Sequence, residues 1–315
     1  MKAFVVHNPV AGIHSPDKVE HLIRQKLEDL QWEYEFYQTS NEESVVQVAS
    51  QARENGFGSV QRDHKGNLTE LPATPFDVFV VAGGDGTVSA VASALAWSGI
   101  PLLIIPSGTG NGLARDLKLP LKLEKAADLL DHPHHVQGVD GMKVGARFFL
   151  LNVSAGLTPA ALKLTDRKEK QRFGRLAYIF AGFRALLGIQ PVTFMLTIDG
   201  GNHEIQASEM ILMNSISLGS TGRFLELGIE NDDGVMDLII IQSRTYLDYV
   251  RVFWNFLLRR PQTDPDVKRF SVREFLTVEA AQSLEVQADG DLIGYTPLHV
   301  EVCPQAVKMI VPLTD

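Results

Sequence analysis

The feature that most constrains the fold is an apolar segment, Phe76–Ala82, that leads directly into Gly83-Gly84-Asp85-Gly86-Thr87 and then a helical pattern over Thr87–Ser98. A segment this apolar is typical of a strand buried on both faces, which occurs mainly in parallel sheets covered by helices. A second such segment, Leu102–Ile105, is followed by the glycine-rich stretch Pro106–Gly112. These segments predict a parallel α/β sheet with glycine-rich loops at the carboxyl ends of two strands.

The rest of the N-terminal half shows the same alternation of strand and helix. Apolar spacing predicts strands at Ala3–His7 and Trp32–Gln38 and helices at Val19–Leu30 and Glu43–Glu54. The polar, turn-rich stretch 58–75 is expected to be an inserted surface loop. This half therefore reads as an α/β nucleotide-binding domain over residues 1–137.

Beyond Gly138 the apolar pattern changes to a period of two, which is typical of antiparallel strands. The predicted strands are Met142–Phe149, Val192–Ile198, Met210–Asn214, Met236–Gln242, Leu276–Glu279 and His299–Val302. Helical patterns interrupt them at Phe173–Gly188 and Thr245–Leu258. We expect an antiparallel β-rich, sandwich-like domain over residues 138–302, and a C-terminal segment, 303–315, that returns to the first domain.

Length, charge and cysteine content narrow the class of protein. The 315 residues suffice for two domains of about 150 residues each. A net charge of −9 does not suit a general nucleic-acid binder, so we expect no nucleic-acid partner. The single cysteine, Cys303, excludes an intramolecular disulfide. With no obvious signal peptide and no apolar run long enough for a membrane span, we expect a cytoplasmic protein that can contact a membrane surface peripherally.

The two glycine-rich loops suggest anion binding. Glycines allow the backbone to approach a ligand closely, and the first N–H groups of the following helix point at an anion. In the first loop, Thr87 can cap the helix or donate to a phosphate. A tight strand-to-helix turn would explain either loop alone. Two loops, with Asn8-Pro9 at a third strand end, predict a binding crevice at one edge of the sheet.

These motifs, in this order, resemble a known family. Asn8-Pro9-Val10-Ala11-Gly12, Gly83–Thr87 and Pro106–Asn111 are similar to motifs of the bacterial lipid kinases, which group diacylglycerol kinases with sphingosine and ceramide kinases. The resemblance continues through Asn152–Gly156 and two acidic motifs, Asn231–Asp237 and Ala288–Asp291, so it covers nearly the whole chain. It does not specify the lipid.

The resemblance implies ATP and Mg²⁺ as cofactors. The residues that it assigns to the nucleotide are Asn8, Pro9, Thr39, Gly83, Gly84, Asp85, Gly86, Thr87, Ser107, Gly108, Thr109 and Asn111. Asp233 matches the metal-ligating carboxylate of the family, and the backbone carbonyls of Glu230 and Val235 match its other metal ligands. On sequence alone, Asp232-Asp233-Gly234 is also explained as a plain hairpin turn.

The catalytic candidates are Asp291, Asp289 and Asp85. Asp291 matches the glutamate that the family uses as general base, so the side chain here is shorter by one C–C bond, about 1.5 Å. Asp289 is the alternative base if Asp291 does not reach. Asp85, with either of them, is expected to hold catalytic Mg²⁺, because hard cations prefer carboxylate oxygens. A surface turn is the alternative explanation for Asp289-Gly290-Asp291.

The helical pattern at Thr245–Leu258 bears on the membrane. Within Thr245–Arg260, one narrow polar stripe is formed by Asp248, Arg251, Asn255 and Arg259, and most of the remaining positions are apolar. Such a helix is either packed on the β-rich domain or lies at an interface. Gly174–Gly188 has a similar pattern, and the two helices together would form an apolar mouth for a lipid.

We therefore expect an ATP- and Mg²⁺-dependent kinase that phosphorylates a lipid hydroxyl at a membrane surface, with diacylglycerol as the first candidate. The sequence leaves open whether the protein forms a homodimer. One alternative is a kinase of a soluble substrate, because NAD kinases also carry Gly-Gly-Asp-Gly-Thr. The other is a nucleotide- or lipid-binding protein with weak catalysis, which the Asp at position 291 suggests.

Overall fold

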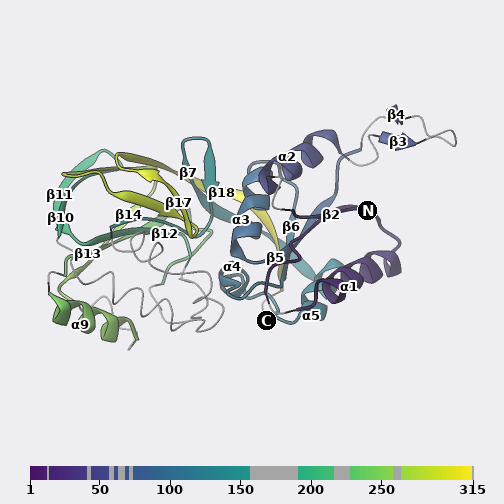
Figure 1. Cartoon of the computed structure of the whole chain (residues 1–315), viewed down its shortest axis with the longest axis horizontal. Helices are drawn as coiled ribbons and strands as arrows, with labels where there is room; N and C mark the ends of the chain where they lie inside the picture. The colour runs from purple at the N-terminus through teal and green to yellow at the C-terminus, as the bar shows by residue number, and fades with distance from the viewer. Residues whose placement is uncertain are drawn as a thin grey trace. The chain divides into compact units, whose positions relative to one another are not determined.

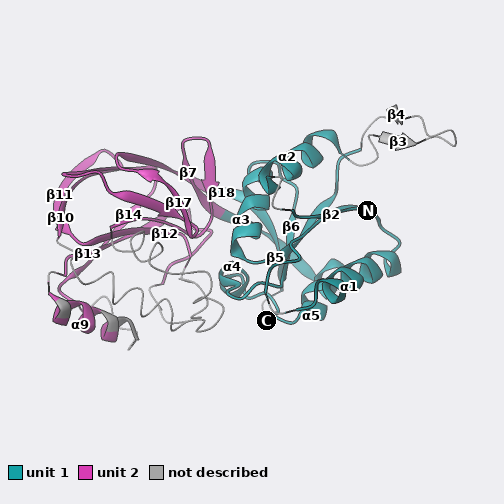
Figure 2. Ribbon diagram, viewed as in Figure 1, with its two compact units in different colours: residues 1–139, 305–315 teal, residues 140–304 magenta. Residues whose placement is uncertain are grey.

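The chain divides into two compact units (Figure 2). Unit 1 comprises residues 1–139 and 305–315, and unit 2 comprises residues 140–304. The computed structural model describes residues 1–12, 14–40, 44–56, 60–62, 68–70, 74–156, 191–215, 228–243, 245–257 and 264–313. The predicted helix Phe173–Gly188 lies outside these residues.

Unit 1 is built on a parallel sheet with the strand order β18-β6-β5-β1-β2. Its strands are β1 (Lys2–His7), β2 (Glu33–Gln38), β5 (Val78–Gly83), β6 (Leu102–Pro106) and the end of β18 (Leu298–Pro312). Its helices are α1 (Pro16–Asp29), α2 (Val45–Asn55), α3 (Asp85–Leu95), α4 (Gly112–Asp116), α5 (Leu123–Ala127) and the 3₁₀ turn η1 (Asp128–Leu130). Every residue of β5 and β6 is buried, as the apolar pattern predicts.

Helices cover both faces of this sheet. α2 packs against α3 and α1 against α5, and Figure 1 shows the two pairs on opposite sides of the strands. The buried residues of α1 are Val19, Ile23 and Leu27, which recur at helical spacing. The parallel α/β fold of the first domain is thus confirmed.

The predicted surface insertion over 58–75 contains a short pair of strands. Two short strands, β3 (Val60–Arg62) and β4 (Leu68–Glu70), pair there in antiparallel fashion. Strands of three residues are too short to give an apolar alternation, so the sequence pattern did not reveal them.

Unit 2 contains two sets of antiparallel strands. One set is the end of β7 (His134–Val144), β8 (Arg147–Phe149), β10 (Val192–Ile198), β11 (Gly201–Ala207), β15 (Phe275–Ala280) and the start of β18. The other has the order β14-β13-β12-β9-β16-β17, with β14 (Val267–Val272), β13 (Met236–Ile241), β12 (Glu209–Met213), β9 (Asn152–Gly156), β16 (Glu285–Ala288) and β17 (Asp291–Tyr295). The helix α9 (Tyr246–Leu257) completes the described part of the unit.

One apolar core joins the two sheets of unit 2. It includes Phe194 and Leu196 from one sheet and Val153, Leu212 and Leu238 from the other, all of them buried. Alternate residues of both sheets thus point inward, as in a β-sandwich. The predicted antiparallel β-rich domain is confirmed.

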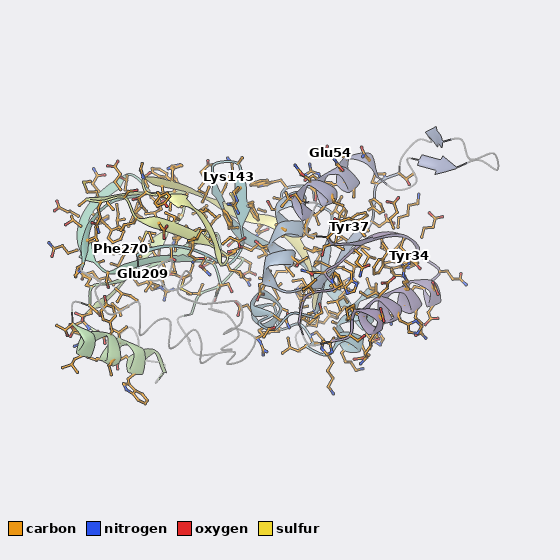
Figure 3. The ribbon with its side chains drawn as sticks, viewed as in Figure 1. Tyr34, Tyr37, Glu54, Lys143, Glu209 and Phe270 are labelled. Carbon is orange, nitrogen blue, oxygen red and sulfur yellow. The ribbon has the colours of Figure 1, made fainter. Side chains whose placement is uncertain are left out.

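β18 is a single strand of 15 residues that contributes to both units. Its first residues pair with β15, from Leu298 opposite Val278 to Glu301 opposite Phe275. Glu301 also forms an ion pair at 3.1 Å with Lys143 of β7, the lysine that Figure 3 labels. Near its end, Met309 pairs in parallel with Leu102 of β6. The chain thus returns to unit 1 after completing unit 2.

The single strand predicted at Met142–Phe149 is a hairpin instead. β7 and β8 pair from Met142 opposite Phe149 to Val144 opposite Arg147, and Gly145 takes a positive φ of 58° in the turn. The alternation of apolar residues continues across this turn, so the pattern alone could not locate it.

Candidate active site

Four parallel strands of unit 1 end at one edge of the sheet. β1 is followed by Asn8, β2 by Thr39, β5 by Gly84 and β6 by Ser107. The N–H of Thr39 donates to the carbonyl of His7 at 2.8 Å, which places Thr39 next to the loop that starts at Asn8. In open α/β sheets, ligands bind outside the carboxyl ends of the strands, so this edge is the candidate nucleotide site.

The loops at this edge touch through backbone atoms. A Cβ added to Gly12 would lie 1.6 Å from the carbonyl oxygen of Ser107. A Cβ added to Gly108 would lie 2.4 Å from the Cα of Gly84. Neither position can carry a side chain, because real Cβ contacts are far longer. The glycines therefore bring three loops into direct contact and leave backbone N–H groups accessible to a ligand.

Asn8 connects the first two loops. Its side-chain amide donates to the Thr87 hydroxyl at 2.8 Å, and its Oδ1 accepts the N–H of Val10 at 3.1 Å. Thr87 is nearly buried and makes no side-chain cap on α3. Of the two uses predicted for Thr87, the helix cap is therefore wrong, and the use of its hydroxyl as a donor to phosphate stays a prediction.

Two buried polar atoms in the third loop lack a hydrogen-bond partner within the described part of the chain. They are the Oγ of Ser107, a residue only 2% exposed, and the Oδ1 of Asn111. The Asn111 amide nitrogen is held by the carbonyl of Gly108 at 2.8 Å, and its backbone is left-handed with φ of 51°. Buried polar groups are nearly always paired, so these atoms indicate a polar ligand such as a nucleotide.

Asp85 stands at the start of α3. One of its carboxylate oxygens accepts the N–H of Leu113 at 3.2 Å, which ties α3 to α4. The N-terminus of α3 carries partial positive charge, which favours both this carboxylate and a phosphate. Thr109 is exposed in the same edge region and is accessible to a ligand.

In unit 2, a fully buried carboxylate holds the predicted metal loop. Asp140 accepts the N–H of Gly234 at 2.7 Å, and its own N–H donates to the carbonyl of Asn231 at 2.7 Å. Asp233 is exposed, and its Oδ1 accepts the N–H of Val235 at 3.0 Å. Sequence reasoning missed Asp140, although one carboxylate within an apolar strand pattern is a signal of a buried polar contact.

Asn214 links Asp140 of β7 to the loop at Leu150. It is fully buried, and its amide donates to the carbonyls of Asp140 at 2.7 Å and Leu150 at 2.8 Å. The carboxylate of Asp289 then accepts three consecutive N–H groups, those of Leu150, Leu151 and Asn152, at 2.9–3.0 Å. One hydrogen-bonded network thus joins the acidic loop to the Asp289 turn.

The Asp289 turn positions Asp291. Asp289 and Gly290 both have positive φ, 49° and 92°, and Ala288 pairs with Asp291, as in a type I′ hairpin. Gln287 accepts the N–H of Gly290 at 2.9 Å. Asp291 is the exposed first residue of β17. The structure therefore places Asp289 in the support of the hairpin and Asp291 at its accessible end.

A second Asp-Gly turn in unit 2 also has a carboxylate that accepts three backbone N–H groups. Asp199 and Gly200 form a two-residue turn with φ of 48° and 88°, and the Asp199 carboxylate accepts the N–H groups of Arg273, Glu274 and Phe275 at 2.8–3.0 Å. Burial favours a higher pKa for Asp199, but these three donors outweigh it and lower the pKa. Asp199 lies outside every predicted site, so its carboxylate shows a structural use of the Asp-Gly turn.

Unit 1 contains a group of side chains of the kinds that bind metals, and a lysine forms ion pairs with it. Among the described residues, Asp128, Asp131 and His132 are the group with three such side chains in reach of one ion. Lys26 forms ion pairs with Asp128 at 3.1 Å and with Asp131 at 2.8 Å. Its ammonium group already supplies the positive charge, so the cluster reads as a salt-bridge network between α1 and the end of α5.

The lone thiol is not a nucleophile. Cys303 is buried, and burial together with the nearby Glu301 raises its pKa to about 11. A thiol with that pKa is protonated at neutral pH, and the thiolate is the reactive form. Covalent catalysis through Cys303 is therefore excluded.

The α/β unit with its glycine-rich ligand edge and the β-sandwich unit with its acidic hairpin are the two parts that the comparisons with known families match. The profile of the diacylglycerol kinase catalytic domain matches residues 2–144, and that of the YegS C-terminal NAD kinase beta sandwich-like domain matches residues 151–311. The chain belongs to the bacterial lipid kinase family that includes the diacylglycerol kinases. It is thus an enzyme, a lipid kinase.

Relatives match over most of their length. The chain is 29% identical to a diacylglycerol kinase of Mycobacterium tuberculosis, covering 81% of this chain and 83% of that protein. It is 25% identical to a diacylglycerol kinase of Bacillus subtilis, covering 94% and 91%. A crystal structure of a diacylglycerol kinase from Bacillus anthracis has the same fold, with a TM-score of 0.75 at 23% identity over 98% of this chain and 96% of that one.

The backbone contact between loops gives a first prediction. Gly12→Ala should weaken binding of an ATP analogue at least about tenfold, or roughly 1.4 kcal/mol, because the new Cβ must push the loop away from Ser107. Gly99→Ala is the matched control, since Gly99 also has a positive φ, 75°, but open space around its Cβ. Gly99→Ala should lose about 1–2 kcal/mol of stability from its positive φ alone. Gly12→Ala should lose more, because its Cβ also meets the Ser107 carbonyl oxygen. Calorimetric titration checks the binding, and equal weakening in both variants would contradict the contact.

The repeated Asp-Gly turn gives a second prediction. Asp199→Asn and Asp289→Asn should each lower the free energy of unfolding by about 1–3 kcal/mol, because each loses a charged acceptor of three N–H groups. Only Asp289→Asn should also lower the rate of phosphate transfer, since it alone supports Asp291. Urea unfolding and kinase assays at a temperature where both variants are folded check this.

The Asp199 comparison extends to pH. Because the folded state lowers its pKa, the stability that Asp199 contributes is complete above the unfolded pKa of about 3.9 and is lost as pH falls through the lower folded-state pKa. As the pH falls from about 5 to the acid limit of folding, the free energy of unfolding should therefore decrease less for Asp199→Asn than for the wild type. The variant has no carboxylate at this position to protonate. Parallel acid-unfolding curves for the two proteins would contradict this role.

Proposed function

We propose that the enzyme transfers the γ-phosphate of ATP to the free hydroxyl of diacylglycerol in a Mg²⁺-dependent reaction. The observation that carries the proposal is the edge of the unit 1 sheet where the glycine-rich loops meet. There the Ser107 Oγ and the Asn111 Oδ1 are buried polar atoms without a partner among the described residues, and a ligand can bond to them. The relatives named diacylglycerol kinases support the choice of acceptor.

The loop edge suits the phosphates of ATP. Backbone N–H groups at Gly83–Thr87 and the N-terminus of α3 favour negative charge. The Ser107 hydroxyl is a further donor, and Asn111, Thr39 and Thr109 are polar groups for the rest of the nucleotide. The unit thus supplies the positioning that phosphoryl transfer depends on.

Two sets of oxygens suit Mg²⁺. Asp85 offers a carboxylate at the loop edge, and Asp233, with the carbonyls of Glu230 and Val235, offers the oxygen donors that hard cations prefer. At the nucleotide, Mg²⁺ would neutralise the charge on the phosphates. At the acidic loop it would brace a segment that Asp140 already holds.

Asp291 is the proposed general base. Its carboxylate accepts the proton of the lipid hydroxyl while that oxygen bonds to the γ-phosphorus and the bond from phosphorus to the ADP oxygen breaks. Because Asp291 is exposed at the end of a braced hairpin, it can meet a hydroxyl without being buried itself. Such a base contributes about 10²–10⁴-fold.

The test is transfer of labelled γ-phosphate to a panel of diacylglycerol, monoacylglycerol, sphingosine and NAD⁺, with and without Mg²⁺. We expect labelled diacylglycerol that requires Mg²⁺, and a loss of at least about 10²-fold in Asp291→Asn. Labelled NAD⁺ in place of lipid would show a soluble-substrate kinase, and ATP binding without any labelled acceptor would show a binding protein.

The same assay locates the base. If Asp291→Asn retains its rate, the proton is taken elsewhere, and Asp289, two positions away in the sequence, is the alternative base. Asp232→Asn is the matched control for loss of one exposed carboxylate, since Asp232 is exposed next to the proposed ligand Asp233 without being assigned to the metal. It should keep most of the wild-type rate.

A further inference from the structure

Gln287 of β16 fastens the Asp289-Gly290 turn to the neighbouring strand β9. The Gln287 Oε1 accepts the N–H of Gly290 at 2.9 Å. The Gln287 Nε2 donates to the Asn152 Oδ1 at 2.6 Å and to the Ser154 Oγ at 2.9 Å. One side chain therefore joins the turn to β9 through three hydrogen bonds.

These bonds determine the orientation of the Gln287 amide. A backbone N–H can only donate, so the amide atom that faces Gly290 is the oxygen, and the nitrogen faces β9. The Asn152 atom that accepts from this nitrogen is then also an oxygen. The position thus requires a side chain that offers an acceptor at one tip atom and donors at the other.

Gln287 is buried although it lies on the outer face of its sheet. Its neighbours in β16, Val286 and Ala288, belong to the apolar core between the two sheets, so Gln287 points away from that core. Ser154 pairs with Gln287 across the strands, and the two residues are 0% and 3% exposed. Burying an amide is costly unless it is hydrogen-bonded, so the three bonds explain how a glutamine can stand here.

Asn152 receives the turn with its backbone as well as its side chain. Its N–H donates to the Asp289 carboxylate at 3.0 Å, and its carbonyl accepts the Asp289 N–H at 3.0 Å. With the Gln287 bond to its Oδ1, Asn152 holds the turn at three of its own atoms. The motif Asn152–Gly156, which carries part of the family resemblance, thus has a use at the turn.

Strand pairing alone does not fix the hairpin that carries Asp291. The pairing of β16 with β17 shifts between Val286 and Gln287, which leaves Ile293 of β17 without an opposite residue in β16. Gly294, the next residue, has a φ of 148°. A bulge of this kind bends the strand and interrupts its ladder of hydrogen bonds. The regular ladder next to Asp291 is therefore short, and the attachment to β9 supplements it.

We infer that Gln287 is a positioning residue for Asp291. The inference rests on the proposed role of Asp291 as the general base. An aspartate has one rotatable bond fewer than the glutamate of the family pattern, so its carboxylate follows the backbone of the hairpin more closely. A displacement of about 1 Å can slow a reaction about 10²-fold. By holding Gly290 against Asn152, Gln287 sets where the carboxylate meets the lipid hydroxyl.

The experiment measures phosphate transfer by the full-length protein in solution. Within the described residues, no helix combines the length and apolar character needed to cross a membrane. The acceptor is a short-chain diacylglycerol dispersed as monomers, so that attachment to vesicles does not limit the rate. The variant is Gln287→Met, because methionine is similar in length and shape but lacks the amide that makes the three bonds.

We expect Gln287→Met to lower kcat at least about tenfold. Its affinity for an ATP analogue should stay within about twofold of the wild type, because the nucleotide edge belongs to unit 1. Gln242→Met is the matched control, since the Gln242 amide of unit 2 donates to the carbonyl of Gln206 at 2.9 Å, outside the hairpin. It should keep the wild-type kcat, and thermal unfolding should confirm that all the proteins are folded at the assay temperature.

A double variant distinguishes positioning from a general loss of structure. Because Gln287 acts through Asp291, adding Gln287→Met to Asp291→Asn should lower kcat by less than about twofold beyond Asp291→Asn alone. Losses that multiply would overturn the inference. So would a wild-type kcat in Gln287→Met beside a slow Asp291→Asn, a result that leaves the proposed function intact. A wild-type rate in Asp291→Asn would remove the base assignment and the inference with it.

Hydrogen exchange gives a readout that does not depend on activity. The Gly290 N–H should exchange at least about tenfold faster in Gln287→Met than in the wild type or in Gln242→Met, because it loses its acceptor. If the wild type labels no lipid, the proposed function fails, and the exchange rate still decides whether Gln287 holds the turn. Unchanged exchange at Gly290 would overturn the inference.

Discussion

Direct backbone contact between loops is the constraint on which the nucleotide edge of unit 1 depends. Gly12 lies against Ser107 and Gly108 lies against Gly84, at distances that leave no room for a Cβ. The parallel sheet supplies the condition for this contact, because it brings the ends of β1, β5 and β6 to one edge. The rest of the site follows from it: the Asn8 bond to Thr87, the buried Ser107 hydroxyl and the exposed start of α3.

In unit 2, side chains rather than backbone contacts hold the loops in place. The buried Asp140 binds the acidic loop, the buried Asn214 binds the strand beside it, and the partly buried Asp289 binds three N–H groups of the 150–152 segment. A buried carboxylate is costly unless it is hydrogen-bonded, and here backbone N–H groups of the neighbouring loops donate to it. The bonds of Asp289 hold the turn that leads into Asp291.

Much of the fold and the position of the ligand edge could be predicted from the sequence. The apolar segments before Gly83 and Ser107 located the buried strands and the ligand edge, because burial on both faces leaves a clear pattern. The Asp233 and Asp291 motifs were located by family resemblance, and their roles remain predictions. The β7–β8 turn was missed because apolar alternation continued through Gly145.

The supporting network could not be predicted. Asp289 and its partner Leu150 are 139 residues apart in the sequence, and Asp140 and Gly234 are 94 apart. A local pattern shows that Asp289-Gly290 is a turn, but not what its carboxylate binds. Likewise, the pattern of α9 showed a polar stripe, and only the structure shows that Arg251 in this stripe binds Asp264 and Asp266.

The measurement that tests the account most directly is a crystal structure of the protein with a non-hydrolysable ATP analogue and Mg²⁺. The account predicts that the phosphates lie against the backbone of Gly83–Thr87, with the Ser107 hydroxyl and the Asn111 side chain hydrogen-bonded to the nucleotide. A nucleotide bound elsewhere, for example in the hollow lined by Phe36, Gln51 and Asn55 between β2 and α2, would contradict it.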